Sequence, residues 1–145
     1  MVEVTSEDDD SPVECAFVSG EARSWRGAVS GSQIIRLVFD QPQRLRRISF
    51  VFEERETART HEFVLRWSPD GGTSFREIVR QQWNFSLPET ICEDEEYQVE
   101  LSNVSVLELM IVPNMSGGAA RASLKHLRLS WPVTLFCSAH RIKQS

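Results

Sequence analysis

Two alternating runs of apolar and polar residues, joined by a strong turn signal, constrain the fold of this chain more than any other feature. The first run is Leu65-Arg-Trp-Ser68, the second is Phe75-Arg-Glu-Ile-Val79, and Pro69-Asp-Gly-Gly72 precedes the second. Proline presets a φ angle of about −65°, the aspartate can hydrogen-bond the turn backbone, and the two glycines accept positive φ angles. The stretch therefore predicts a β-hairpin.

Period-2 alternation also dominates the rest of the chain from Gln33 onward. Each run places its apolar side chains on one face, turn residues separate the runs, and helical periodicity is nearly absent. Tallied, the pattern predicts seven or eight strands in an all-β fold, an antiparallel β-sandwich of jelly-roll type. The expected strands, besides the second arm of the hairpin, are Gln33–Phe39, Arg44–Phe52, His61–Ser68, Glu96–Ser102, Val104–Val112 and Ala122–Trp131. The strand His61–Ser68 includes the first arm of the hairpin.

The chain has 145 residues, which is enough for one domain. Residues 1–12 are acidic and lack apolar periodicity, so they predict a disordered acidic tail. Residues 13–132 are expected to form the sandwich, and residues 133–145 a C-terminal tail. Three widely separated cysteines, Cys15, Cys92 and Cys137, indicate reduced thiols rather than a disulfide framework.

Charge and hydropathy exclude several classes of partner. The net charge of −5 argues against bulk nucleic-acid binding, because the phosphate backbone favours a strongly basic face. No apolar run approaches the roughly 20 residues that would span a bilayer, so no membrane partner is expected. The N-terminus begins with acidic residues and has no secretory signal pattern, which predicts a cytoplasmic protein. The oligomeric state does not follow from the sequence.

The hairpin and four other segments, in this order and spacing, resemble the discoidin-like domains, also called coagulation factor five/eight type C or galactose-binding-like domains. The resemblance extends over about residues 15–130 and implies a β-sandwich that binds ligands through loops at one end. The matching segments are Ser19-Gly20 with Ser24-Trp25, Arg36-Leu-Val-Phe-Asp-Gln-Pro42, Arg44-Leu-Arg-Arg-Ile48, Ser68-Pro-Asp-Gly71 and Ala122-Ser-Leu-Lys-His-Leu127.

The resemblance implies a non-catalytic binding module, with carbohydrate as the first-ranked ligand. Its ligand would lie on loops that correspond to Glu53–His61, Trp83–Asp94 and Asn114–Ser123. Sugar-binding relatives commonly stack an aromatic ring on the sugar near the last loop, where this chain has alanines, so Trp83 or Phe85 would have to supply the ring. The candidate ligand-binding residues are Arg55, Arg59, His61, Trp83, Asn84, Phe85, Asn114 and Arg121.

The resemblance also bears on metal binding. Family members often hold a structural calcium ion with an aspartate and a threonine of the first segment and a glutamate of the last strand. Here Ser19 stands in place of the aspartate and His126 in place of the glutamate. Because calcium prefers oxygen ligands, loss of two carboxylates predicts that the protein binds neither calcium nor another metal, and no cofactor is expected.

Two alternatives to a sugar-binding module remain open. The three histidines have no metal-ligand spacing, and no nucleophile or phosphate-loop motif occurs, so an enzyme is disfavoured. The runner-up is an intracellular protein-interaction module, resembling the N-terminal domain of a DNA single-strand-break repair scaffold. Exposure of Trp83 and Phe85 beside Arg55 or Arg59 would favour a sugar. Burial of both aromatics under a flat, charged end would favour a protein partner.

Overall fold

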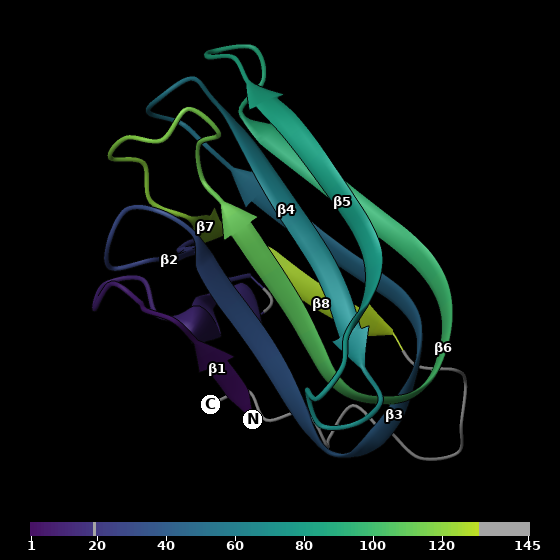
Figure 1. Ribbon diagram of the computed structural model, residues 1–145. Coiled ribbons are helices and arrows are strands. Elements are labelled where there is room, and N and C mark those ends of the chain that lie inside the picture. Colours follow the sequence, from purple (N-terminus) through teal and green to yellow (C-terminus); the bar gives the residue numbers. More distant parts are fainter. Residues whose placement is uncertain (19, 131–145) are drawn as a thin grey trace.

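The computed structural model describes residues 1–18 and 20–130 (Figure 1). These residues form eight strands and one short 3₁₀ turn, so the predicted antiparallel β-sandwich is confirmed. The elements are β1 (Val2–Val4), η1 (Val13–Ala16), β2 (Trp25–Arg26), β3 (Gln33–Glu53), β4 (Arg59–Ser68), β5 (Arg76–Phe85), β6 (Cys92–Val112), β7 (Ser123–Leu124) and β8 (His126–Ser130).

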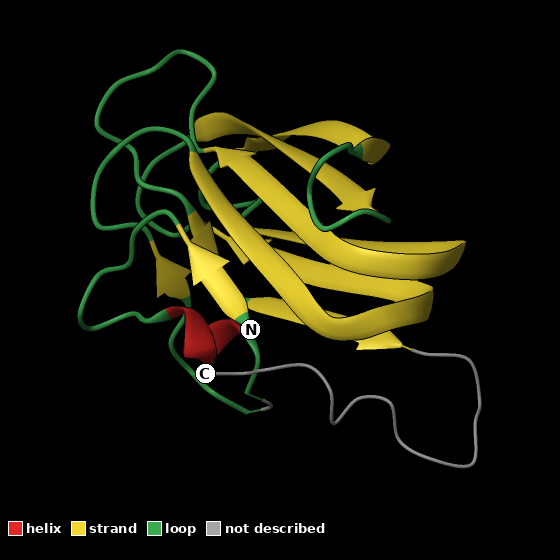
Figure 2. Ribbon diagram, turned by 60° about the horizontal axis from the view of Figure 1, so that its bottom comes forward, coloured by secondary structure: helices red, strands yellow, loops and turns green. Residues whose placement is uncertain are grey.

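Two long bent strands, β3 and β6, build both layers of the sandwich. Residues 33–38 of β3 pair with residues 106–111 of β6, and after the bend residues 47–53 pair with residues 92–98. One layer therefore contains β1, the first half of β3, the second half of β6, β4 and β5; the other contains β8, the second half of β3 and the first half of β6. Figures 1 and 2 show both strands curving through the bend.

Aromatic rings join the two layers in the core. Phe50 and Phe52 face inward from the second half of β3, and Phe63 faces them from β4. The Phe50 and Phe63 ring centroids lie 5.0 Å apart in an edge-to-face arrangement, and the Phe52 and Phe63 centroids lie 5.4 Å apart. Edge-to-face pairs at this spacing are favourable beyond the area they bury. The inward parity expected from the alternation is correct in both strands.

The predicted hairpin is confirmed as β4 and β5. Gly71 and Gly72 have φ angles of 72° and 97°, as the turn requires. The Asp70 carboxylate accepts hydrogen bonds from the Ser74 amide at 2.9 Å and from the Ser74 hydroxyl at 2.6 Å, and the Ser68 hydroxyl donates to it at 2.7 Å. These bonds lower the pKa of Asp70 to about 2, so the turn keeps its charge over the usual pH range.

Several strand boundaries differ from the expectation, and three of the differences bear on the site and on the core. The expected strands Gln33–Phe39 and Arg44–Phe52 form one continuous strand, β3. The chain bends from one layer to the other around Asp40 without leaving the sheet. β5 continues beyond Val79 to Phe85, so the aromatics expected in a loop lie on a strand. β6 begins at Cys92 rather than Glu96, because acidic residues that face the interior hide the alternation at its start.

The expectation that residues 1–12 form a disordered tail is wrong. β1 pairs with β3, with Val2 opposite Leu37 and Val4 opposite Ile35. The segment is also held by polar contacts: the Thr5 hydroxyl donates to Gln33 at 2.6 Å, and the buried Trp25 indole donates to the Ser6 carbonyl at 3.2 Å. A search for apolar periodicity misses such long-range polar contacts. The expected tail at 133–145 lies outside the described residues.

Within residues 1–18 and 20–130, no helix has the length and hydropathy needed to cross a membrane. Cys15 is buried and Cys92 is exposed, and both are free thiols, while Cys137 lies outside the described residues.

Candidate functional site

Four loops meet at one end of the sandwich. The bend in β3 returns this strand to the end at which it started, so the loops before and after β3 lie at the same end. The four loops are residues 27–32, 54–58, 86–91 and 113–122, at the upper left in Figure 1. Ligand sites in β-sandwich folds commonly lie on loops that a rigid scaffold positions. A groove of 430 Å³ opens between two of these loops, 54–58 and 113–122, and the strand β2. It is lined by Arg26, Glu54, Glu56, Thr57, Asn114, Gly117, Gly118, Ala119, Ala120 and Arg121.

Arg59, at the start of β4, fastens two walls of the groove to each other. Its side chain is only 3% exposed. Its Nε donates to Glu54 Oε1 at 2.5 Å, and its Nη1 donates to the carbonyl of Pro113, the residue that begins the loop 113–122. The guanidinium also lies over the Phe85 ring, 5.6 Å from the centroid. Arg59 is therefore a buried clamp rather than a ligand-facing side chain.

Glu54 completes this clamp by closing the loop 54–58 on itself. Its Oε2 accepts hydrogen bonds from the Glu56 amide at 2.8 Å and the Thr57 amide at 3.2 Å. Burial alone would raise the pKa of Glu54, but the Glu56 amide and Arg59 together lower it below its ordinary value. The carboxylate is thus charged and fully engaged, and it shapes the groove wall.

The opposite wall is built from segments far apart in the chain. β2 pairs with β7, which brings Arg26 beside Ser123. Arg121 Nη1 lies 3.4 Å from Asp8 of the N-terminal segment and 3.4 Å from the Ala28 carbonyl. Gly117 has a φ angle of 81°, a left-handed conformation that β-carbon-bearing residues rarely adopt. The groove is therefore lined by two guanidinium groups and by the glycines and alanines of residues 117–120.

Of the eight candidate residues from the sequence, two line the groove and six do not. Asn114 and Arg121 line the groove. Arg59 is buried behind it, and Arg55 is exposed outside the lining and pairs with Glu53 at 3.1 Å. The other four also lie outside the lining. His61 and Phe85 are buried, Trp83 is half-buried on β5, and the exposed Asn84 accepts a hydrogen bond from Thr60.

Four groove residues with polar or charged side chains, besides the glycines and alanines of residues 117–120, were not among the candidates. Glu54, Glu56 and Thr57 lie in the loop 53–61 that the sequence predicted as ligand-bearing, but the predicted ligand-binding residues of that loop were Arg55, Arg59 and His61. Arg26 reaches the groove only through the pairing of β2 with β7. The β2 strand is two residues long, so period-2 alternation gives no signal for it.

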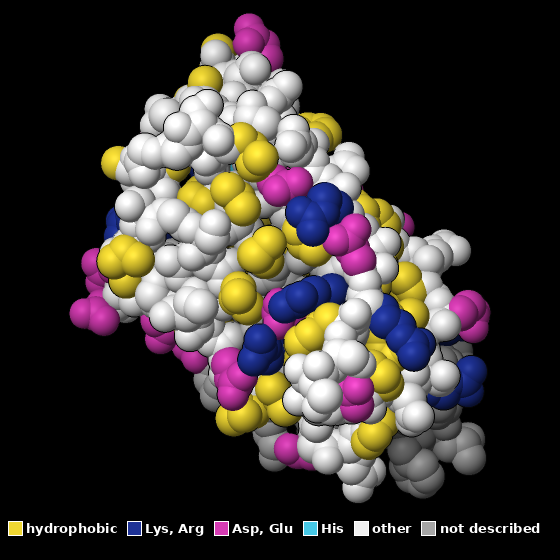
Figure 3. Space-filling view, in the orientation of Figure 1, with side chains coloured by type: hydrophobic (Ala, Val, Ile, Leu, Met, Phe, Trp, Pro, Cys, Tyr) yellow, Lys and Arg dark blue, Asp and Glu magenta, His cyan; other side chains and the backbone are white. Residues whose placement is uncertain are grey.

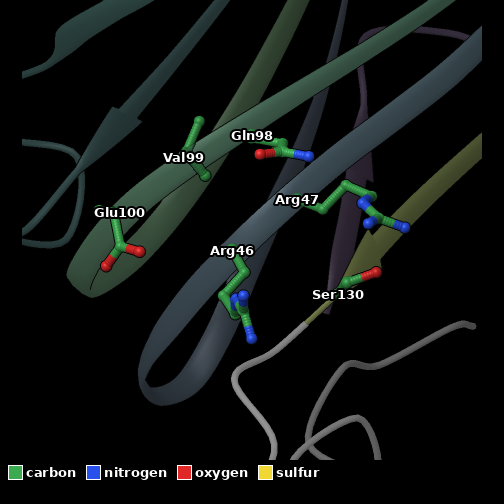
Figure 4. A pocket seen from close by; sticks show the side chains of 6 residues that line it. All are labelled: Arg46, Arg47, Gln98, Val99, Glu100 and Ser130. Atoms are coloured by element: carbon green, nitrogen blue, oxygen red, sulfur yellow. The ribbon is translucent and has the colours of Figure 1, made fainter.

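A second hollow, of 390 Å³, lies on the three-stranded layer near its bend. It is lined by Arg46, Arg47, Gln98, Val99, Glu100 and Ser130. Figure 4 shows these side chains spread along neighbouring strands instead of converging on one point. Arg47 is also paired with Glu96 at 3.4 Å. The loop-end groove is the better candidate, because its lining converges from separate loops.

No group of three or more histidine, cysteine or acidic side chains suited to a metal ion occurs among the residues described. His126, which replaces the expected calcium ligand, is half-buried on β8, and its pKa is lowered by burial and by the charges of Arg128 and Lys125. Ser19, the other replaced ligand, lies outside the described residues.

Calcium is expected to leave the melting temperature unchanged. A metal held at about 100 times its dissociation constant would stabilise the protein by about 2.7 kcal/mol, which a thermal melt detects readily. A rise in melting temperature with calcium that a chelator reverses would contradict this expectation.

No protein-family profile matches the sequence, and no curated protein matches it. Solved structures do. A pectin-binding carbohydrate-binding module is 16% identical over 93% of this chain and 92% of that chain, with a TM-score of 0.64. The family 32 module of AlyQ, in complex with 4,5-unsaturated mannuronic acid, is 13% identical over 90% and 93%, with a TM-score of 0.64. The family 32 module of Clostridium perfringens NanJ, in complex with galactose, is 13% identical over 89% and 91%, with a TM-score of 0.62.

These likenesses show the fold. The chain has the galactose-binding-like β-sandwich that the three modules share. The similarity covers nearly all of each module, so the whole domain is matched rather than a shared substructure.

Proposed function

We propose that this protein is a non-catalytic carbohydrate-binding module whose ligand lies in the loop-end groove. The observation that carries the proposal is a hollow of 430 Å³ between loops, on a fold shared with carbohydrate-binding modules. Assignment to the discoidin-like domains within this fold belongs to the same proposal, and the hairpin and the order of the matching segments support it.

The lining suits a single sugar ring bound chiefly by hydrogen bonds. The Asn114 amide and the Arg121 guanidinium are donors, the Glu56 carboxylate is an acceptor, and Thr57 is both. The backbone and small side chains of Gly117 to Ala120, which line the groove, offer an apolar surface for the C–H face of the ring. The groove lining contains no aromatic ring, so affinity for one ring should be modest.

Galactose, pectin fragments and mannuronate oligosaccharides are suitable probes in isothermal titration. We expect binding of at least one of them, and Arg121→Ala should weaken that binding at least roughly tenfold, because one charge-assisted hydrogen bond contributes about 1.5–3 kcal/mol. The matched control is Arg55→Ala, an exposed arginine at the same end that lies outside the groove lining. Absence of binding to all three probes, or equal loss in both variants, would overturn the proposal.

The protein-interaction module remains the second candidate, and burial of Phe85 supports it. Burial of both Trp83 and Phe85 under a flat, charged end would favour a protein partner. Phe85 is buried, but Trp83 is only half-buried and the end is hollow rather than flat. The outer face of the five-stranded layer, seen in Figure 3, mixes arginines and carboxylates. A cytoplasmic location is part of this second candidate.

One cluster on that face fits a protein interface. Glu108, only 1% exposed, accepts hydrogen bonds from Arg36 at 2.7 Å and from Arg66 at 2.7 Å, and Arg66 lies 4.1 Å from the centroid of the Phe75 ring. Arginines fixed in this way are frequent hot spots of interfaces. If cross-linking in a lysate captures a partner, Arg66→Ala should abolish the capture while glycan binding persists.

A further inference from the structure

Four ionisable side chains, two of them buried and two half-buried, lie together on one side of the sandwich, apart from the groove. Glu93, Glu95 and Tyr97 alternate along the start of β6, and His61 faces Glu93 from β4. His61 Nε2 lies 2.6 Å from Glu93 Oε1, and the Tyr97 hydroxyl donates to Glu95. Glu93 is 0% exposed and His61 is 1% exposed. Glu93 Oε2 is buried with no hydrogen-bond partner.

The surroundings of this cluster are mostly aromatic. The Phe52 ring from β3 lies 4.6 Å from the His61 ring, and the Phe85 ring from β5 lies 5.0 Å from it, measured between centroids. Phe50 packs beside Tyr97, with centroids 5.9 Å apart. These inward side chains of β3 and β5 are not titratable.

The cation whose charge acts on His61 is Arg59 on the same strand, and Arg59 is paired with Glu54. Burial, followed by the charge of Arg59, lowers the pKa of His61 to about 4, so the imidazole is neutral at physiological pH. Burial also raises the pKa of Glu93. Burial and the neighbouring Glu93 carboxyl raise the pKa of Glu95 to about 7. Two adjacent carboxyls without a cation to balance them resist ionising together.

We propose that Glu93 and Glu95 share a proton in the folded protein, and that its loss on the alkaline side of neutrality loosens this side of the sandwich. In the unfolded chain both carboxyls have ordinary pKa values of about 4.3. The folded state therefore binds the proton more tightly than the unfolded state does. The resulting stabilisation is complete below about pH 4.3 and is lost as the pH rises through about 7.

The cluster shares its strands with the groove. β6 begins immediately after the loop 86–91, and the Glu54 amide donates to the Ile91 carbonyl at 2.8 Å. β4 begins at Arg59, two residues before His61. Loosening here would thus reach the clamp that shapes the groove. Only this link rests on the proposed function; the shared proton is tested without any ligand.

Thermal melts of the wild-type protein and of Glu95→Gln between pH 6.5 and 8 test the proposal. The unfolded imidazole of His61, with an ordinary pKa of about 6.5, titrates in the lower part of this window, but it does so equally in both proteins, so the difference between them reports Glu95. The Cys15 and Cys92 thiols, whose pKa values burial raises, titrate mostly above the window. We expect the wild-type melting temperature to fall by a few degrees across the window, and the fall to be reduced in Glu95→Gln, which cannot release a proton.

Glu96→Gln is the matched control, since Glu96 is the next residue, points to the outer face and is 57% exposed. Its melting temperature should follow the wild-type dependence on pH. Equal pH dependence in wild type, Glu95→Gln and Glu96→Gln would overturn the proposal. If Glu95→Gln does not fold, carboxyl NMR of the wild type decides: a Glu95 midpoint near its ordinary value would also overturn it, whatever the glycan experiments show.

Discussion

Arg59→Ala is expected to lower the free energy of unfolding by about 3–5 kcal/mol, because removing one partner of a buried ion pair leaves the other charge uncompensated. Glu54, with a side chain 12% exposed, would lose its cation, and the Pro113 carbonyl would lose its donor. Urea denaturation measures the loss. Hydrogen exchange should show faster exchange in both loops, residues 54–58 and 113–116, because the same side chain holds them.

Two further variants test whether the loss of stability comes from the specific contacts of Arg59 or from the loss of a positive charge. Arg55→Ala removes an arginine that is 65% exposed and pairs with Glu53 at 3.1 Å, and such surface pairs contribute about 1 kcal/mol or less. Arg59→Lys keeps the charge, but one ammonium group cannot reproduce the planar fork that reaches both Glu54 and the Pro113 carbonyl. Its stability should be intermediate. A loss below about 1 kcal/mol for Arg59→Ala with unchanged loop exchange would show that Arg59 is no clamp.

The sequence predicts those parts of the fold in which burial follows the strand period. The hairpin and the inward residues of β3 and β4 have this property, so turn chemistry and alternation are sufficient for them. The start of β6 does not, because Glu93 and Glu95 face the interior and look like a solvated loop in the sequence. The N-terminal segment is ordered by the pairing of β1 with β3 and by polar contacts to Gln33 and Trp25, and a single sequence does not reveal such long-range contacts.

The candidate site was predicted at the level of loops and less well at the level of residues. The loops around residues 54–58 and 113–122 were identified, and Asn114 and Arg121 line the groove. Arg59 and Phe85 are buried strand residues because β4 begins earlier and β5 ends later than the pattern indicated, and His61 is buried at the strand position where the pattern already placed it. A shift of strand ends by a few residues is enough to move a side chain from the surface into the core.

Phe50→Ala is the second change with a large expected effect, again about 3–5 kcal/mol, because it removes a ring from the centre of the core and leaves a cavity. Phe50 is 1% exposed, and its ring centroid lies 5.5 Å from Phe52, 5.0 Å from Phe63 and 5.9 Å from Tyr97. Those neighbours come from both layers. In urea denaturation, the midpoint should fall while the denaturant slope stays constant.

Val51→Ala is the matched control, since Val51 is the next residue and points to the outer face of the same strand. Its loss should stay within about 1 kcal/mol. The double variant Phe50→Ala with Phe63→Ala should lose less than the sum of the single losses, because both rings line one space between the layers and the second truncation enlarges an existing cavity. Additive losses would mean that the two layers do not meet at these rings, and the pairing of Phe50 with Phe63 would then be wrong.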